Sequence, residues 1–381
     1  MGKENNKKSG KIRCGLLLMA GLVLFTGVPV FTAYAGPAEE NGTAVFRVGP
    51  SGGLSADNSY YNQPVVNPVV KPVDRYSYDQ MVHDLFNLAA RYPGKMTLQA
   101  IGQSLDGRAI YNVIVGNPEA QTRILVQGAI HGREYIVTPL IMQQIESMLS
   151  GYDSGAYRGQ KLSDLLSSAS VHFVPMVNPD GVTLSQQGEA GIRSAELRQS
   201  IQTAYAMDLA DGKTTLEYGE YLKRWKSNGR GVDLNYNFDA DWETINSSLT
   251  HVSYATYRGP EILSEPESQT MFRLASAYPY AATVSYHAMG NVIYWDTREN
   301  KKTEESYALA SAVSSVTGYT VQANQGVGGF KDWHQRSELA APGITIEVGR
   351  TACPVEFSEY QEIWQQNKEV PALVLAQTLS K

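Results

Sequence analysis

Cysteine is scarce in this 381-residue chain, which holds only Cys14 and Cys353. Cys14 lies in an N-terminal segment that we expect to be removed, so the mature chain keeps one thiol and has no internal disulfide. The stability of such a chain must come from the size of its apolar core. Apolar residues make up 43% and charged residues 18% of the sequence. This balance is typical of a folded protein and excludes a disordered one.

The chain also has fewer basic than acidic residues. It holds 32 Lys and Arg residues and 38 Asp and Glu residues, which gives a net charge of −6. The first 35 residues hold five basic residues and one Glu, so residues 36–381 carry −10. A strongly acidic mature chain excludes nucleic-acid binding that is driven by general positive charge. We therefore expect no nucleic-acid partner.

The basic start of the chain is typical of a secretory signal peptide. A Lys-rich stretch precedes an apolar run at residues 16–28, and Ala33–Ala35 supplies the small residues that a signal peptidase accepts. The alternative is an uncleaved anchor, since the apolar stretch approaches the ~20 residues that span a bilayer. Pro29 and the Ala-x-Ala site favour cleavage. We expect a signal peptide over residues 1–35, a secreted or cell-wall-associated product, and no stable membrane association after cleavage.

The remaining chain divides into two parts. Residues 36–72 are rich in Gly, Pro, Asn and Ser and show no sustained apolar period, which predicts a linker or an extended arm. Residues 73–381 contain no second linker, internal repeat or low-complexity run. They are therefore predicted to form one large catalytic domain.

Within that domain the apolar period alternates between helix and strand. Met81, Leu85 and Leu88 share one face of a predicted helix that ends at residues 92–94, and two strands that flank Asp106-Gly107 are predicted to form a hairpin. Segments with helical patterns, such as residues 136–149, separate further short apolar runs. The predicted strands are residues 97–101, 109–115, 124–130, 171–177, 281–286 and 344–348. This order predicts an α/β fold with a mixed, centrally parallel sheet sandwiched by helices.

The polar residues after these strands are candidates for a functional site, because ligands bind at the carboxyl ends of parallel strands. His131 and Glu134 follow the first central strand three residues apart, a spacing at which an imidazole and a carboxylate can bind one zinc ion. A lone pair of this kind is more often a solvated surface pair. His287 ends a neighbouring strand and completes three ligands with the fourth position open to water, which is the pattern of catalytic zinc.

The chain has six histidines, and the other four are predicted to have structural roles. None has an acidic or histidine partner at ligand spacing. His83 is expected on a surface helix and His172 in a strand. His251 and His334 are expected in loops.

Glu347 is the candidate general base, because a Glu in an otherwise apolar strand is costly to bury unless it is paired or functional. The alternative is a buried Glu paired with an arginine such as Arg350. Beside a zinc site the functional interpretation is favoured. Glu347 would take a proton from the attacking water and pass it to the leaving amine.

Taken together, these motifs resemble the zinc carboxypeptidases of the carboxypeptidase A type, peptidase family M14. The resemblance covers residues 73–381 and rests on residues 131–134, 231–235, His287 and Glu347 in that order. It implies a mixed eight-stranded sheet between helices and one Zn²⁺ ion. It also implies that His131, Glu134 and His287 are the metal ligands and that Glu347 is the base.

Several positions depart from the pattern of the digestive members of that family. Asn235 is followed by Tyr236 where those enzymes have an arginine that clamps a terminal carboxylate, so the forked guanidinium is missing. Lys226 stands where the family has the arginine that polarises the scissile carbonyl, and a lysine can stabilise an oxyanion as a point charge. The family's mobile tyrosine corresponds to Asn324, with Tyr319 as a substitute if the loop bends differently.

A narrower resemblance comes from residues 225–228, 328–333 and 349–354, which are similar to those of bacterial γ-D-glutamyl-meso-diaminopimelate peptidases. It implies that Lys331 and Asp332 meet the carboxylate and the amine at the end of a diaminopimelate side chain; the alternative is a solvated Lys331. Arg133 is expected to contact substrate or to be a surface charge. Arg230 is a candidate replacement for the missing cation near Asn235.

Three functions remain open at this point. The first is a secreted zinc peptidase that hydrolyses the γ-D-Glu–diaminopimelate bond of peptidoglycan stem peptides. The second is a zinc carboxypeptidase or deacylase that acts on ordinary peptides or another amide. The third is a non-catalytic cell-wall-binding protein. The complete set of predicted ligands and base argues against the third, and the altered positions Tyr236 and Asn324 favour the first over the second.

Overall fold

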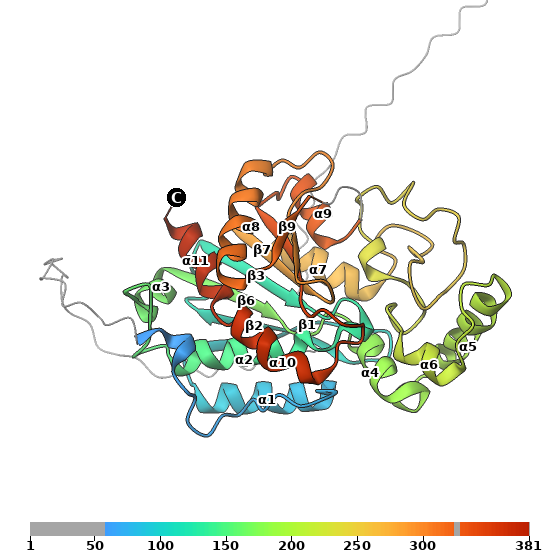
Figure 1. Ribbon diagram of the computed structural model, residues 1–381, viewed down its shortest axis with the longest axis horizontal. Helices are drawn as coiled ribbons and strands as arrows, with labels where there is room; N and C mark the ends of the chain where they lie inside the picture. Colours follow the sequence, from blue (N-terminus) through green and yellow to red (C-terminus); the bar gives the residue numbers. More distant parts are fainter. Residues whose placement is uncertain (1–57, 324–327, 381) are drawn as a thin grey trace, which may run out of the picture.

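The centre of the structure is an eight-stranded sheet in the order β1-β2-β6-β3-β7-β10-β8-β9 (Figure 1). Its four central strands, β6, β3, β7 and β10, are parallel, while β1, β2 and β8 run antiparallel to neighbours. This confirms the predicted mixed, centrally parallel sheet. The strands are β1 (Met96–Gln103), β2 (Ala109–Gly116), β3 (Thr122–Gly128), β6 (Ala169–Val174), β7 (Ala282–His287), β8 (Val292–Tyr294), β9 (Thr320–Gln322) and β10 (Gly343–Glu347). A separate small hairpin pairs β4 (Ala156–Tyr157) with β5 (Gln160–Lys161).

The computed structural model describes residues 58–323 and 328–380. The predicted signal peptide, the first part of the predicted arm and Asn324 lie outside this range. Within it, no helix combines the length and the apolar character needed to cross a membrane.

Helices pack on both faces of the sheet, as the sequence predicts. The larger apolar core lies on one face, where α1, α2, α3, α8, α10 and α11 contribute to it, and the smaller core lies on the other, under α7 and α9. The helices are α1 (Tyr78–Arg91), α2 (Val137–Ser150), α3 (Leu162–Ser168), α4 (Pro179–Gln187), α5 (Ala195–Ala210), α6 (Tyr218–Lys223), α7 (Pro266–Ala277), α8 (Thr303–Thr317), α9 (Phe330–Arg336), α10 (Tyr360–Asn367) and α11 (Val370–Leu379). The predicted hairpin and first helix correspond to β1–β2 and α1.

The alternation of side chains in β7 shows how one strand serves both the core and the site. Ala282, Val284 and Tyr286 point into the larger core. The alternate residues of the strand, of which His287 is the last, face the opposite side of the sheet, because successive side chains of a strand point to opposite faces. The strand therefore buries one face for stability and presents the other to the site.

The N-terminal arm is part of the packed structure from Asn58 onward, earlier than the predicted domain start at residue 73. Tyr60 and Val70 are 1% and 2% exposed. The backbone amides of Val69 and Val70 donate hydrogen bonds of 2.8 and 2.7 Å to the carboxylate of Glu146 in α2. Residues 58–72 are thus an extended arm bound to the domain, and not a free linker.

The segment between α4 and Lys226 contains α5 and α6, which project from the edge of the molecule in Figure 1. It has a small core of its own that includes Trp225, which is fully buried. The Nε1 of Trp225 donates a hydrogen bond of 2.9 Å to the carbonyl of Asn228. These contacts fix the segment that carries Lys226.

Candidate active site

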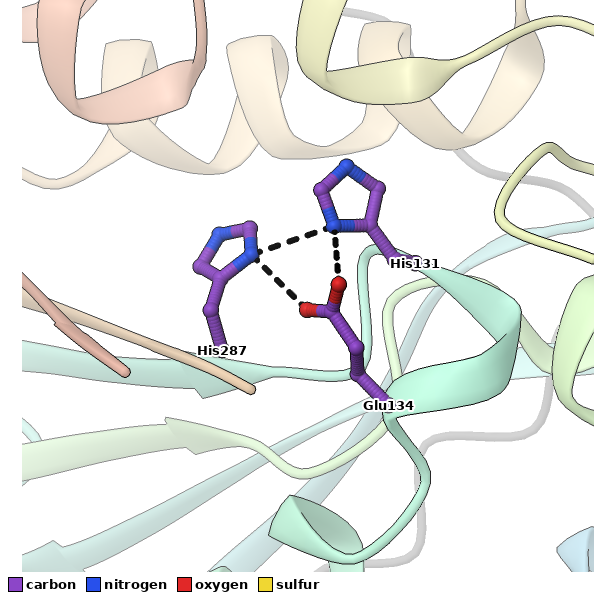
Figure 2. Close-up of side chains that lie close together, drawn as sticks. All are labelled: His131, Glu134 and His287. Carbon is purple, nitrogen blue, oxygen red and sulfur yellow. Dashed lines mark hydrogen bonds and ion pairs between the residues drawn. The ribbon is translucent and has the colours of Figure 1, made fainter. Parts of the chain in front are cut away.

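Three ligand side chains meet at the carboxyl ends of β3 and β7, as predicted. His131 precedes a short 3-10 turn, η3 (Gly132–Glu134), Glu134 is the last residue of that turn, and His287 is the last residue of β7. All three are buried, and Figure 2 shows them pointing at one another. Nδ1 of His131 lies 2.8 Å from Oε1 of Glu134 and 3.2 Å from Nδ1 of His287, and the latter nitrogen lies 3.0 Å from Oε2 of Glu134.

This donor set fits a zinc ion. Bonds of ~2.0–2.1 Å in a tetrahedral site place neighbouring ligand atoms about 3.3 Å apart, close to the separations seen here. Two imidazoles and one carboxylate are the ligands of many catalytic zinc sites. In the described part of the chain, this is the one group of three such side chains close enough to share an ion. The alternative of a solvated surface pair is excluded by their burial.

The turn that carries the ligands depends on a close backbone approach. A Cβ atom at Gly132 would lie 2.4 Å from the carbonyl carbon of Gly181 in α4. The amide of Gly132 donates a hydrogen bond of 3.0 Å to the carbonyl of Lys226. The Nδ2 of Asn178 donates to the carbonyls of Ile130 and Ser227, at 3.0 and 3.1 Å. The ligand turn and the Lys226 segment are therefore tied together.

Asp233 is a functional residue that the sequence analysis did not assign, although it lies within the quoted motif at residues 231–235. Its Oδ1 lies 3.1 Å from Nε2 of His131, on the far side of the ring from Glu134. Burial alone would raise the pKa of Asp233, but His131 and Lys226 hold that pKa well below its usual range. A carboxylate in this position fixes the tautomer and the orientation of a metal-binding imidazole.

Glu347 lies beside the ligands because of strand register. It is the last residue of β10 and the direct partner of His287 across the parallel β7–β10 ladder. Removal from water raises the pKa of Glu347 to about 7. Arg350, the alternative partner, is exposed and pairs with Glu362 instead. The geometry therefore leaves Glu347 available for proton transfer near neutral pH, where a general base is most effective.

Lys226 contributes a positive charge at the same edge of the sheet. Its Nζ lies 4.0 Å from Oδ2 of Asp233, and 21% of the side-chain surface is exposed. Burial would lower the pKa of Lys226, but Asp233 and Glu134 raise it, so the side chain is cationic. A cation here suits the predicted role of stabilising negative charge on the substrate.

These groups open into a cavity of about 120 Å³ under α9. Its lining includes the predicted residues His131, Lys226, Asn235, His287, Lys331, Asp332 and Glu347, together with Gln127, Asp233, Tyr236, Ser285, Tyr294 and Thr345. The structure thus brings most of the predicted site residues to one cavity. Tyr236 lies in its wall, where the sequence departs from the arginine of the digestive enzymes.

Lys331 and Asp332 line the cavity, but they are already paired with each other. The Nζ of Lys331 donates to Oδ1 of Asp332, to the carbonyl of Asp296 at 2.7 Å and to Oε1 of Gln335 at 3.2 Å. An ammonium has three donors, and all three are used. The alternative of a solvated Lys331 is excluded, because the residue is 6% exposed. Direct contact of this pair with substrate stays a prediction.

Two predicted cations, Arg133 and Arg230, are not among the residues that line the cavity. Arg133 is half-buried, and the carbonyl of the same residue accepts a contact of 3.8 Å from Sγ of Cys353. The guanidinium of Arg230 bonds both carboxylate oxygens of Glu265, at 3.1 and 2.7 Å, so its charge is already paired. Glu265 is fully buried and needs that charge, which accounts for the position of Arg230.

Two further expectations are corrected. His334 lies in α9 and not in a loop. Tyr319 cannot replace the mobile tyrosine of the family in this arrangement, because it is 2% exposed and its hydroxyl donates a hydrogen bond of 2.8 Å to Gln366. His172 is fully buried in β6, as its position in a predicted strand implied.

Known proteins are similar to this chain in sequence. The family model described as zinc carboxypeptidase matches residues 81–370. The gamma-D-glutamyl-L-diamino acid endopeptidase 1 of Lysinibacillus sphaericus is 30% identical over 303 residues, which are 78% of this chain and 72% of that protein.

Solved structures show the same architecture. Carboxypeptidase A from Helicoverpa armigera has a TM-score of 0.57 at 19% identity, with 82% of this chain and 78% of that chain covered. Thrombin activatable fibrinolysis inhibitor has a TM-score of 0.61 at 19% identity, with 83% and 80% covered. These likenesses support the fold, and the matched model and the ligand set agree on the chemistry. The chain therefore belongs to the zinc carboxypeptidase family, peptidase M14, and is a zinc metallopeptidase.

Proposed function

We propose that the protein is an exported peptidase that hydrolyses the γ-D-Glu–diaminopimelate bond of peptidoglycan stem peptides. The observation that carries this proposal is Tyr236 in the cavity wall, in place of a guanidinium that clamps a terminal carboxylate. The relative from Lysinibacillus sphaericus, named for a γ-D-glutamyl-L-diamino acid bond, supports the same substrate class. An enzyme without the clamp has less reason to select ordinary C-terminal residues.

The residues divide the work of hydrolysis among them. His131, Glu134 and His287 would hold one zinc ion, which supplies Lewis-acid polarisation when bound. Glu347 accepts a proton from the attacking water and returns it to the leaving amine. Lys226 places a fixed positive charge where the scissile carbonyl oxygen gains negative charge. Asp233 keeps the His131 ring oriented for the metal.

The substrate is tested by direct comparison. The zinc-loaded mature chain is offered L-Ala-γ-D-Glu-diaminopimelate and, separately, a standard C-terminal peptide, and the released amino acid is quantified. We expect cleavage of the first at a kcat/KM at least tenfold above that of the second. Cleavage of only the standard peptide would support the ordinary carboxypeptidase, and no turnover of either with zinc bound would support the wall-binding protein.

Export is the second part of the proposal, and it rests on the basic, apolar and Ala-x-Ala pattern of residues 1–35. Expression of the full chain in a bacterium with signal peptidase should give an extracellular product that begins at Gly36. Mass spectrometry of the secreted N-terminus checks this. An intact Met1 in a membrane fraction would contradict it and support an uncleaved anchor.

A further inference from the structure

A row of polar side chains crosses the sheet beneath the metal-binding residues. Gln127, Ser285, Thr345 and Tyr294 are aligned on the neighbouring strands β3, β7, β10 and β8, each paired in register with the next. Ser285 and Thr345 lie two positions before His287 and Glu347 on the same face. A step of two residues in a strand is about 6.6 Å. This polar row is therefore the floor of the cavity, one layer below the catalytic groups.

Helix α9 forms the roof over this floor. The Cγ of Lys331 would lie 3.3 Å from a Cβ atom placed at Gly343, and Nε2 of Gln335 donates a hydrogen bond of 2.9 Å to the carbonyl of Gly343. The ammonium of Lys331 is saturated by its three acceptors. A substrate carboxylate could bond this lysine only if one of those partners left. The charged pair in the roof is thus better suited to fix α9 than to bind an anion.

Gln127 is the member of the polar row with an unused group. It is 1% exposed, and its Nε2 donates a hydrogen bond of 2.9 Å to Oγ of Ser285. Its Oε1 is buried, and no donor in the described part of the chain lies within hydrogen-bonding distance. An unpaired buried amide oxygen costs about 1–3 kcal/mol, a cost that a ligand bearing a donor removes. The Gln127 side chain lines the cavity that also holds His131, His287 and Glu347 in its wall.

We propose that Gln127 is a specificity-determining residue that selects leaving groups with an ammonium at the end of the side chain. Oε1 of Gln127 accepts a hydrogen bond from that ammonium, and the hydroxyls of Ser285 and Thr345 are further acceptors beside it. The side-chain amine is the feature that lysine, ornithine and diaminopimelate share. The inference rests on the proposed function, because it names how the same cavity recognises a diamino acid.

The test compares leaving groups of equal length on the zinc-loaded enzyme. Three substrates, L-Ala-γ-D-Glu-X with X as lysine, norleucine or 2-aminoadipate, differ at the side-chain end. For the wild type we expect kcat/KM for lysine to exceed that for norleucine at least tenfold, since an amide left unpaired rejects the isostere. Gln127→Met should reduce this ratio by about tenfold or more.

Two further variants keep the test decisive. Gln127→Glu places a charged acceptor on the floor and should increase the preference for lysine over norleucine. Gln103→Met makes the same change at an exposed strand residue and should leave the ratio unchanged. A ratio that is unaffected in both Gln127 variants overturns the inference. So does a wild-type preference for 2-aminoadipate over lysine, because a carboxylate would require the amide nitrogen to face the cavity.

The same three leaving groups on a benzoylglycyl acyl group separate this inference from the proposed function. If only the benzoylglycyl series is hydrolysed, the proposed γ-D-glutamyl specificity is wrong. The ratio of lysine to norleucine in that series still measures the role of Gln127.

Discussion

His131 is held by carboxylates on both sides of its ring, and each side has a different task. Glu134 faces Nδ1 together with His287, which is where the metal would bind, while Asp233 faces Nε2. The ring therefore has little freedom to rotate. Asp233 is hydrogen-bonded to His131 and close to Lys226, so a change at this residue acts on metal binding through the orientation of His131 and the local charge without removing a ligand.

Asp233→Asn should lower zinc affinity by about 10–100-fold, as loss of such an outer carboxylate does in other metal sites. Competition with a chromophoric chelator measures the affinity directly. Asp211→Asn is the matched control, because Asp211 also pairs with a histidine, His251, but on the surface. Equal affinities for the wild type and Asp233→Asn would contradict the role given to Asp233.

Glu347→Gln should keep zinc at wild-type stoichiometry and lose nearly all turnover, by about 10²–10⁴-fold in kcat, because the amide cannot accept a proton. Metal content is measured by atomic absorption and kcat by release of the amine product. Loss of zinc in this variant would show instead that Glu347 is a ligand or a structural residue.

At the scale of elements, the site depends on how turns pack against helices. The η3 turn and α4 touch backbone to backbone at Gly132 and Gly181. The amide of Gly132 also donates a hydrogen bond to the carbonyl of Lys226, so the turn links the predicted ligands to the segment that carries Lys226. The addition of a single methyl group at this contact should therefore displace both the predicted metal ligands and the Lys226 segment.

Gly132→Ala should lower the free energy of unfolding by about 2 kcal/mol or more, since a backbone contact of 2.4 Å cannot be relieved by a side-chain rotation. Chemical denaturation measures the change. Gly219→Ala in α6 is the control: its new methyl meets no atom within 4 Å, and it should raise stability by about 0.5–1 kcal/mol. Similar effects for the two variants would refute the tight contact.

The sequence predicts the central strands and the β1–β2 hairpin well and misses the opposite edge of the sheet, for a physical reason. Strands β3, β6, β7 and β10 are buried and appear as apolar runs. Strands β8 and β9 have three residues each, too few for a period to be recognised. Helix α9 has seven residues and follows two glycines, which led to the wrong assignment of His334 to a loop.

The same limit applies to the site. His131, Glu134, His287 and Glu347 could be identified because each lies at the end of a predicted strand. Asp233 and Gln127 act through contacts that span 102 and 158 residues of sequence. No local spacing in the sequence reveals such contacts, so the roles of these two residues could be recognised only from the three-dimensional structure. The charge of Lys331 was predictable, but its saturation by three acceptors was not.

For the molecule as a whole, buried histidines couple stability to pH. His172 is fully buried under Tyr280, whose hydroxyl lies 3.1 Å from Nδ1, and burial lowers the pKa of His172 to about 3. The unfolded chain binds a proton at this histidine below about pH 6.5, whereas the folded chain does not. Stability from this group is therefore present at neutral pH and is lost as the pH falls from about 6.5 toward 3.

His172→Gln should reduce the loss of unfolding free energy between pH 7 and pH 5 by about 2 kcal/mol relative to the wild type. Urea denaturation at both pH values gives the difference, and other titrating groups cancel in the comparison. His83→Gln, on the exposed face of α1, is the control. An unchanged pH dependence in His172→Gln would show that His172 is not kept neutral in the folded state.

The in-register pairing of His287 with Glu347 has a consequence for how relatives of this enzyme diverge. The separation of ligand and base is set by ladder hydrogen bonds, and mutations in loops do not alter it. In the function proposed above, substrate preference depends on α9 and on the side chains of the cavity floor. Related enzymes can therefore differ in substrate through changes in one helix and a few side chains that face the cavity, while the relative positions of the metal ligand and the base stay the same.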